Sequence, residues 1–155
     1  MKKLILLLFS ITILVSCITT TPLEEDPQVL RVVETDKSKE ELYRLSNEWM
    51  VESFRSSDEV IEYSDKTEGV IMGKGYTSFS NIMGENQVWY TIKLETKDNR
   101  ARINIYDFYL ITYVGTNKRR GEAFPNKESW DQSKDKIIAI ADDYEDYIKS
   151  KTEDW

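Results

Sequence analysis

The side chains that enzymes use most often for catalysis are nearly absent from this chain. It has no histidine, and Cys17 is its only cysteine. Histidine is the commonest general base and metal ligand, and cysteine thiolate is a common nucleophile and zinc ligand. Catalytic triads that use histidine are therefore excluded, as are zinc sites built from histidine and cysteine. Any remaining chemistry would have to use carboxylates, lysine, tyrosine or serine.

Cys17 follows a segment typical of an export signal. Two lysines precede an apolar run over residues 4–15, and Ser16 is the small residue before the cleavage point. This run is shorter than the roughly 20 apolar residues of a membrane-spanning helix. Because the Leu-Val-Ser-Cys sequence ending at Cys17 resembles a bacterial lipobox, we predict that residues 1–16 are a lipoprotein signal peptide. The alternative is an ordinary secretory signal that leaves a free thiol.

Lipidation of Cys17 would anchor the protein in a membrane. By resemblance to other lipoboxes, the mature chain would begin at Cys17 with a diacylglyceryl thioether and an acylated amine, and two acyl chains anchor a protein stably. Ile18 is not the aspartate linked to inner-membrane retention in enteric bacteria. We therefore expect a lipid-anchored protein of the cell envelope, at the outer membrane, with the leaflet left open.

The segment after the lipidation site predicts a flexible tether. Residues 17–28 contain threonines, prolines and the acidic run Glu24-Glu25-Asp26, a composition that cannot bury apolar surface. About ten extended residues reach at most roughly 35 Å. The tether would therefore hold the rest of the chain at a short distance from the membrane.

The remaining chain, residues 29–155, has the length of one domain. Removing 16 signal residues from 155 leaves 139, and the loss of two lysines leaves 19 basic against 28 acidic residues, a net charge of −9. Such an acidic body repels phosphate backbones, so we expect no nucleic-acid partner. No cofactor motif is present, and the oligomeric state is left open.

Hydrophobic periodicity predicts an α+β domain with the order strand, helix, four antiparallel strands, helix. Ser38 and Glu41 have capping-box spacing and mark the first helix, over residues 39–55. The last helix begins between residues 126 and 133 and carries an apolar stripe to Ile148. We expect the strands at residues 29–33, 60–64, 70–79, 88–96 and 100–112, and a loop at 115–130.

The strongest local prediction is a hairpin that turns at Asp98-Asn99, residues that tolerate the backbone of a tight turn. In this register four aliphatic side chains share one face, which both helices would cover. The opposite face would be open to solvent and would contain two cross-strand pairs. These pairs are Glu95 with Arg102 and Trp89 with Phe108.

Three segments of the chain resemble a known family. They are the helix with Tyr43, Trp49 and Phe54, the glycine-spaced strand at residues 69–75, and the hairpin at residues 97–102. Together they are similar to a Bacteroidetes family of exported proteins, a domain of unknown function with a TBP-like fold. The resemblance covers residues 29–148 and implies the same order of elements. It implies no catalytic residues.

Two sequence motifs have ordinary structural explanations. The glycines between Gly69 and Gly75 lack the spacing of a phosphate-binding loop and lie in a strand pattern. They therefore favour a bulge or a close approach of the backbone. The basic run at residues 118–120 is most simply a solvated loop, although it could contact an acidic partner or a lipid headgroup.

The open face is the candidate binding site. Exposed aromatic side chains bordered by charge are typical of contact surfaces, so we expect this face to dock an envelope protein, a peptide or a glycan. The simplest alternative is that the aromatic pairs only stabilise the sheet. The candidate residues are Trp89, Lys93, Arg102, Asn104, Tyr106 and Phe108.

The sequence leaves two other functions open, a glycan hydrolase and a structural subunit. A glycan hydrolase would need two carboxylates flanking a cleft, but the predicted face offers only Glu95, which Arg102 neutralises. A structural subunit of an outer-membrane assembly would pair its edge strands with a partner chain. The sequence favours a binding module that is not an enzyme.

Overall fold

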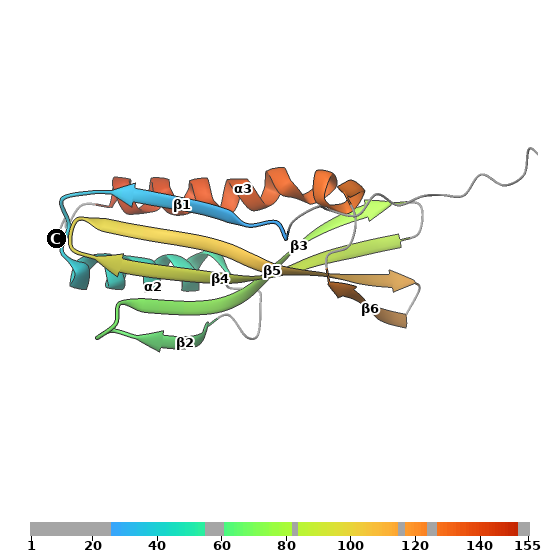
Figure 1. Cartoon of the computed structure of the whole chain (residues 1–155), viewed down its shortest axis with the longest axis horizontal. Coiled ribbons are helices and arrows are strands. Elements are labelled where there is room, and N and C mark those ends of the chain that lie inside the picture. Colours follow the sequence, from blue (N-terminus) through green and yellow to red (C-terminus); the bar gives the residue numbers. More distant parts are fainter. Residues whose placement is uncertain (1–25, 55–60, 82–83, 115–116, 124–126, 152–155) are drawn as a thin grey trace, which may run out of the picture.

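Side chains alternate along the strands, so that one face of the single sheet is apolar, and a layer of helices covers that face (Figure 1). The computed structural model describes residues 26–54, 61–81, 84–114, 117–123 and 127–151. The predicted signal peptide, Cys17 and most of the predicted tether lie outside these residues.

The sheet has six strands, and every pairing is antiparallel. The strand order is β1-β5-β4-β3-β2, with β6 also paired to β5. The strands are β1 (Val29–Glu34), β2 (Ile61–Asp65), β3 (Val70–Asn81), β4 (Gly84–Lys97), β5 (Arg100–Val114) and β6 (Asn117–Ala123). The helices are α2 (Lys39–Ser53) and α3 (Lys127–Ser150).

The predicted α+β fold is confirmed, with one strand more than expected. β1 pairs with residues 100–105 of β5, and β6 pairs with residues 109–114 along the same edge. The expected loop at 115–130 thus contains a strand. Its sequence, NKRRGEA, lacks the apolar alternation that would reveal a strand, and the far half of the long strand β5 provides its partner.

The hairpin between β4 and β5 turns where the sequence predicts, and its tip holds the start of α2. Asn99 has a φ of 65°, a conformation that asparagine tolerates better than most residues. Its N–H donates to the carbonyl of Lys37 at 2.9 Å. The Asp98 carboxylate accepts a 2.8 Å hydrogen bond from the N–H of Lys39, and Ser38 caps the helix as predicted. The turn therefore satisfies one of the N–H donors that the first turn of α2 leaves free.

Both helices pack on the same face of the sheet and against each other. Trp49 of α2 meets Tyr144 of α3 edge to face, with ring centroids 4.9 Å apart. The Tyr144 hydroxyl and Ser46 Oγ share a buried 2.8 Å hydrogen bond, and Trp49 Nε1 donates to Asp143 at 2.8 Å. These polar contacts fix the helix pair above the aliphatic residues of the sheet. Those residues include Val33, Ile71, Val88, Ile92, Leu94, Ile103 and Ile105.

Two glycines sit where another side chain would collide with its neighbours. Gly69 has a φ of 74°, and a Cβ there would lie 2.6 Å from the carbonyl oxygen of Thr96. A Cβ on Gly75 would lie 2.8 Å from the Tyr90 ring and 2.9 Å from the Phe54 ring. The predicted close approach of the backbone is confirmed at Gly69, whereas at Gly75 two aromatic rings pack against the strand.

The pairing of β4 with β5 follows the predicted register only as far as Tyr106. Ile92 lies opposite Ile105, and Glu95 lies opposite Arg102, as expected. Trp89, however, lies opposite Tyr109. One extra residue of β5 is accommodated here, where Asp107 has a φ of 56°. Beyond this β-bulge, the alternation of inward and outward side chains along β5 is shifted by one residue.

Phe108 was expected on the open face, and that prediction is wrong. Its side chain is only 5% exposed and lies in the core. It packs edge to face against Tyr90 at 6.1 Å and Trp130 at 5.4 Å between ring centroids. The physical reason is the bulge at Asp107, which turns Phe108 inward.

The inward position of Phe108 predicts unequal costs for two neighbouring aromatic residues. Phe108→Ala should lower the free energy of unfolding by about 3–5 kcal/mol, because it leaves a cavity between the buried Tyr90 ring and the partly buried Trp130 ring. Tyr106→Ala should cost clearly less, since Tyr106 is half-buried on the open face. Urea unfolding of both variants measures the difference. An equal loss, or a larger loss for Tyr106→Ala, would contradict the bulged register.

Candidate binding face

The open face of the sheet is the surface opposite the helices, formed by outward residues of β2, β3, β4 and β5 and bordered by Leu30 and Val32 of β1. Five of the six predicted site residues lie on it: Trp89, Lys93, Arg102, Asn104 and Tyr106. Arg102 is exposed, whereas the other four are half-buried. Phe108 is the one that the structure removes from the site.

A charged group occupies the part of this face next to the hairpin. Arg102 donates to Glu95 through Nε at 2.9 Å and Nη2 at 2.5 Å, and Lys93 Nζ lies 3.2 Å from the same carboxylate. Partial burial by itself would raise the pKa of Glu95. The hydrogen bonds from Arg102 and Lys93 outweigh burial and hold its pKa below the ordinary value. Glu95 is therefore ionised at neutral pH and fixes the position of Arg102.

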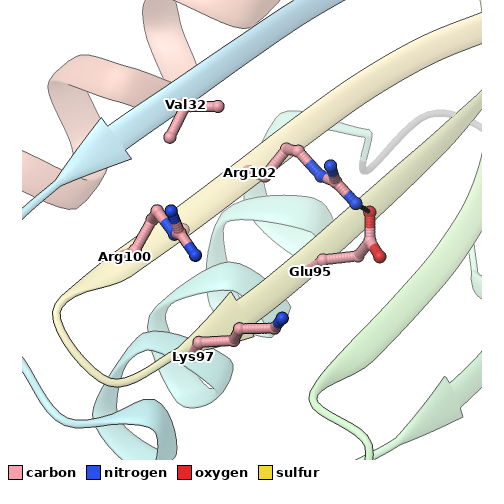
Figure 2. A pocket seen from close by; sticks show the side chains of 6 residues that line it. Val32, Glu95, Lys97, Arg100 and Arg102 are labelled. Carbon is pink, nitrogen blue, oxygen red and sulfur yellow. Dashed lines mark hydrogen bonds and ion pairs between the residues drawn. The ribbon is translucent and has the colours of Figure 1, made fainter.

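Two further basic residues extend this group to the hairpin tip. Lys97 and Arg100 lie directly opposite each other, and both are exposed. With Val32, Glu95 and Arg102 they line a cavity of about 160 Å³ (Figure 2). The sequence analysis did not include Lys97 and Arg100 in the site. Continuing the alternation from Glu95 and Arg102 toward the turn would have found them.

The centre of the open face carries a row of three aromatic rings on three neighbouring strands. Tyr76 stacks on Trp89 with centroids 5.0 Å apart and 28° between the ring planes. Trp89 stacks on Tyr109 at 6.1 Å and 14°. The indole thus has a tyrosine ring beside each of its flat faces. This row stabilises the sheet and offers a partner mainly the edge of the Trp89 ring.

Aliphatic side chains from β1 add an apolar border that the sequence analysis also missed. Leu30 is 53% exposed and Val32 is 45% exposed. Arg31, between them, points to the other side and forms ion pairs with Asp142 and Glu145 of α3. The alternation around Arg31 was the available signal, because it places Leu30 and Val32 away from the helices.

Two further polar groups on this face are paired with neighbours. Lys74 Nζ donates to Glu62 at 2.7 Å, and this hydrogen bond raises the pKa of the lysine. The Thr91 hydroxyl donates to Asp107 at 3.4 Å. The aromatic row is therefore flanked by one ion pair and one hydrogen bond between a hydroxyl and a carboxylate.

Within the described ranges, no group of three or more acidic or cysteine side chains is arranged to hold a metal ion. Across the same residues, neither helix has the length and hydropathy needed to cross a membrane.

Comparison with solved structures places the fold among TBP-like proteins. A TBP-like protein from Parabacteroides distasonis superposes with a TM-score of 0.66 at 15% identity, over 86% of this chain and 99% of that protein. A DUF4468 family protein from Bacteroides ovatus gives a TM-score of 0.57 at 16% identity, over 84% of this chain and 88% of its own. At these identities the similarity establishes the fold alone. No curated protein matches the chain.

The family match covers the segment that carries the candidate face. The family model described as a domain of unknown function (DUF4468) with TBP-like fold matches residues 31–110, just over half of the chain. This segment runs from β1 into β5 and includes the charged hairpin and the bulge. The resemblance noted from the sequence is confirmed, and the chain belongs to the DUF4468 family of TBP-like domains.

Proposed function

We propose that this protein is a cell-envelope lipoprotein that binds a partner protein through the open face of its sheet and is not an enzyme. The distribution of exposed apolar side chains carries this proposal. Six large apolar or aromatic side chains are exposed in the described part of the chain. Four of them lie on the open face: Leu30, Val32, Tyr63 and Tyr76. Apolar side chains gathered on one surface and bordered by charge are typical of protein contacts.

The aromatic row favours a protein or peptide partner over a glycan. A sugar ring stacks on the flat face of an aromatic side chain, but each flat face of Trp89 already has a tyrosine ring beside it. The aliphatic border formed by Leu30 and Val32 suits the side chains of a protein, since burying it removes apolar surface from water.

The proposed anchor agrees with the position of β1. A tether over residues 17–28 would lead from lipidated Cys17 directly into β1, which begins at Val29 and borders the open face. Two acyl chains would keep the domain at the membrane, and the tether would leave it free to turn its open face toward a partner. The proposed location is the cell envelope, at the outer membrane.

The charges on the open face support binding rather than hydrolysis. A carboxyl group that acts as a general acid needs a raised pKa, whereas the pKa of Glu95 is lowered by its two basic partners. Glu62 is likewise held by Lys74 at 2.7 Å. These carboxylates therefore fix neighbouring side chains.

A second candidate is a structural subunit that joins a partner through β1. β1 pairs only with β5, so in the described part of the chain its other edge has no strand partner. A strand from another protein could extend the sheet there. Arg31 points inward from β1 to ion-pair with α3, and such charges are typical of edge strands protected against pairing. This protection favours the open face over the edge as the contact surface.

Mass spectrometry of the native protein tests the anchor. We expect the mature chain to begin at Cys17 with the mass of a diacylglyceryl thioether and an acylated amine. Cys17→Ser should abolish this modification, whereas Ser16→Ala keeps a small residue before the cleavage point and should be processed normally. A different mature N-terminus, or an unmodified thiol at Cys17, would contradict the proposed anchor.

Site-specific photo-crosslinking tests the open face. A photoreactive amino acid replaces Val32 or Tyr76 in the full chain, which is purified in detergent and mixed with solubilised envelope of the cells that make it. Both positions should give the same discrete adduct, because both are exposed on the proposed contact surface. Control positions are Arg44 and Ile138, which are exposed on α2 and α3.

The control positions decide between a specific surface and general stickiness. The proposal expects no adduct, or a much weaker one, from Arg44 and Ile138. It is wrong if the helix positions give the adduct and the open face does not, or if all four positions react alike. Absence of any adduct that depends on the open face would also contradict it.

A further inference from the structure

The cavity at the hairpin end of the open face has the charge and shape of a small anion site. It measures about 160 Å³ and is lined by Val32, Glu95, Lys97, Arg100, Ala101 and Arg102. Figure 2 shows Lys97 and Arg100 projecting from neighbouring strands of the hairpin, with Arg102 turned toward Glu95. A typical small-molecule pocket is about 300–1,000 Å³. This cavity therefore suits one side-chain-sized group.

The local charge is opposite in sign to that of the whole protein. On β1, β4 and β5 the outward charged residues at this end are four bases and two acids, a balance of +2, whereas the full chain carries −7. The bases are Lys93, Lys97, Arg100 and Arg102, and the acids are Glu34 and Glu95. A positive site on an acidic body attracts an acidic group locally while the rest of the molecule repels extended anionic surfaces.

Lys97 and Arg100 provide the strongest argument for an external anion. They lie directly opposite each other, a position in which like charges destabilise a sheet. Among the described residues neither forms an ion pair, whereas Lys93 and Arg102 are both held by Glu95. An incoming carboxylate would relieve the repulsion, and the planar Arg100 guanidinium is suited to bind both of its oxygens.

The side of the cavity formed by β1 is apolar. Val32 lines it, and Leu30 continues the same exposed surface along the strand. A ligand that fills the cavity and covers this border must carry an acidic group beside aliphatic ones. A peptide segment has this chemistry. A phosphate headgroup has the charge alone, and a membrane surface would also meet the acidic body of the protein.

We propose that this cavity receives the carboxylate of an acidic residue in a peptide segment of the partner protein, whose aliphatic neighbours lie on Leu30 and Val32. The proposal rests on the open face being the binding surface and specifies the chemistry of its partner. Lys97 and Arg100 hold the carboxylate, Glu95 keeps Arg102 in place, and β1 supplies the apolar contact.

A labelled peptide tests this assignment on the full chain purified in detergent. The probe is a capped hexapeptide that alternates leucine and glutamate, and its control has glutamine in place of glutamate. The glutamate peptide should bind measurably more tightly. The Lys97→Glu/Arg100→Glu variant should weaken binding by about tenfold or more, since it replaces charge-assisted hydrogen bonds to the carboxylate with repulsion. Fluorescence anisotropy measures the affinity, and added salt should weaken it.

The matched control is Arg44→Glu/Lys134→Glu, which changes the net charge equally on the helix layer and should leave the affinity unchanged. Lys97→Gln/Arg100→Gln removes the charges without adding acids and should also weaken binding. Circular dichroism confirms that each variant is folded. Equal binding of the two peptides, or equal loss in the control variant, would overturn the proposal. Binding to phosphatidylglycerol vesicles through Lys97 and Arg100, without peptide binding, would also overturn it.

Crosslinking separates failure of this site from failure of the open face. If the adducts from Val32 and Tyr76 persist in Lys97→Glu/Arg100→Glu, the open face binds its partner without this cavity, and the anion proposal alone is wrong. If the chain that keeps Lys97 and Arg100 also gives no adduct from Val32 or Tyr76, the proposed function is wrong as well.

Discussion

The pairing of β4 with β5 is the constraint on which the rest of the structure depends. Ile92 and Leu94 lie on the same side as Ile103 and Ile105, so two neighbouring strands present one continuous aliphatic surface. α2 and α3 cover that surface, and the other side remains open. Because side chains alternate along a strand, a slip of one residue would expose the aliphatic side chains and bury the charged ones. The open face is therefore a consequence of how the core is built.

The sequence predicted the parts of the fold in which local pattern and tertiary packing agree. The Ser38 cap, the apolar stripes of both helices and the Asp98-Asn99 turn follow from local chemistry that the fold retains. β6 was missed because its sequence carries no strand pattern, and its pairing depends on the length of β5. A contact that depends on another element cannot be found from local periodicity.

The bulge also separates the site residues that the sequence placed on the correct face from the one that it did not. Before Asp107, alternation placed Lys93, Arg102 and Asn104 on the correct face. After it, strict alternation assigned Phe108 to the face that Tyr109 occupies. A bulge is set by how a long strand accommodates the packing of its neighbours, which no local signal around Asp107 revealed. Lys97 and Arg100 were within reach of the pattern, because they continue the alternation to the turn.

A TBP-like fold does not by itself identify a function. The family is one of unknown function, and an acidic chain is poorly suited to the nucleic-acid binding that the fold name brings to mind. What this chain offers is a helix-backed sheet with an open face that is apolar along β1, aromatic at its centre and basic at the hairpin. These three zones lie side by side because β1, β5, β4 and β3 are neighbours in one sheet. These zones together form the proposed contact surface.

The most direct test of this account is solvent paramagnetic relaxation of side-chain resonances in the full chain, using a soluble gadolinium chelate. The side-chain resonances of Leu30, Val32 and Tyr76 should broaden strongly. Those of Ile92, Ile103 and Phe108 should be protected. Broadening of Phe108 and the isoleucines as strong as that of Leu30 and Val32 would contradict it. Protection of Leu30 and Val32 in the protein without a partner would do the same.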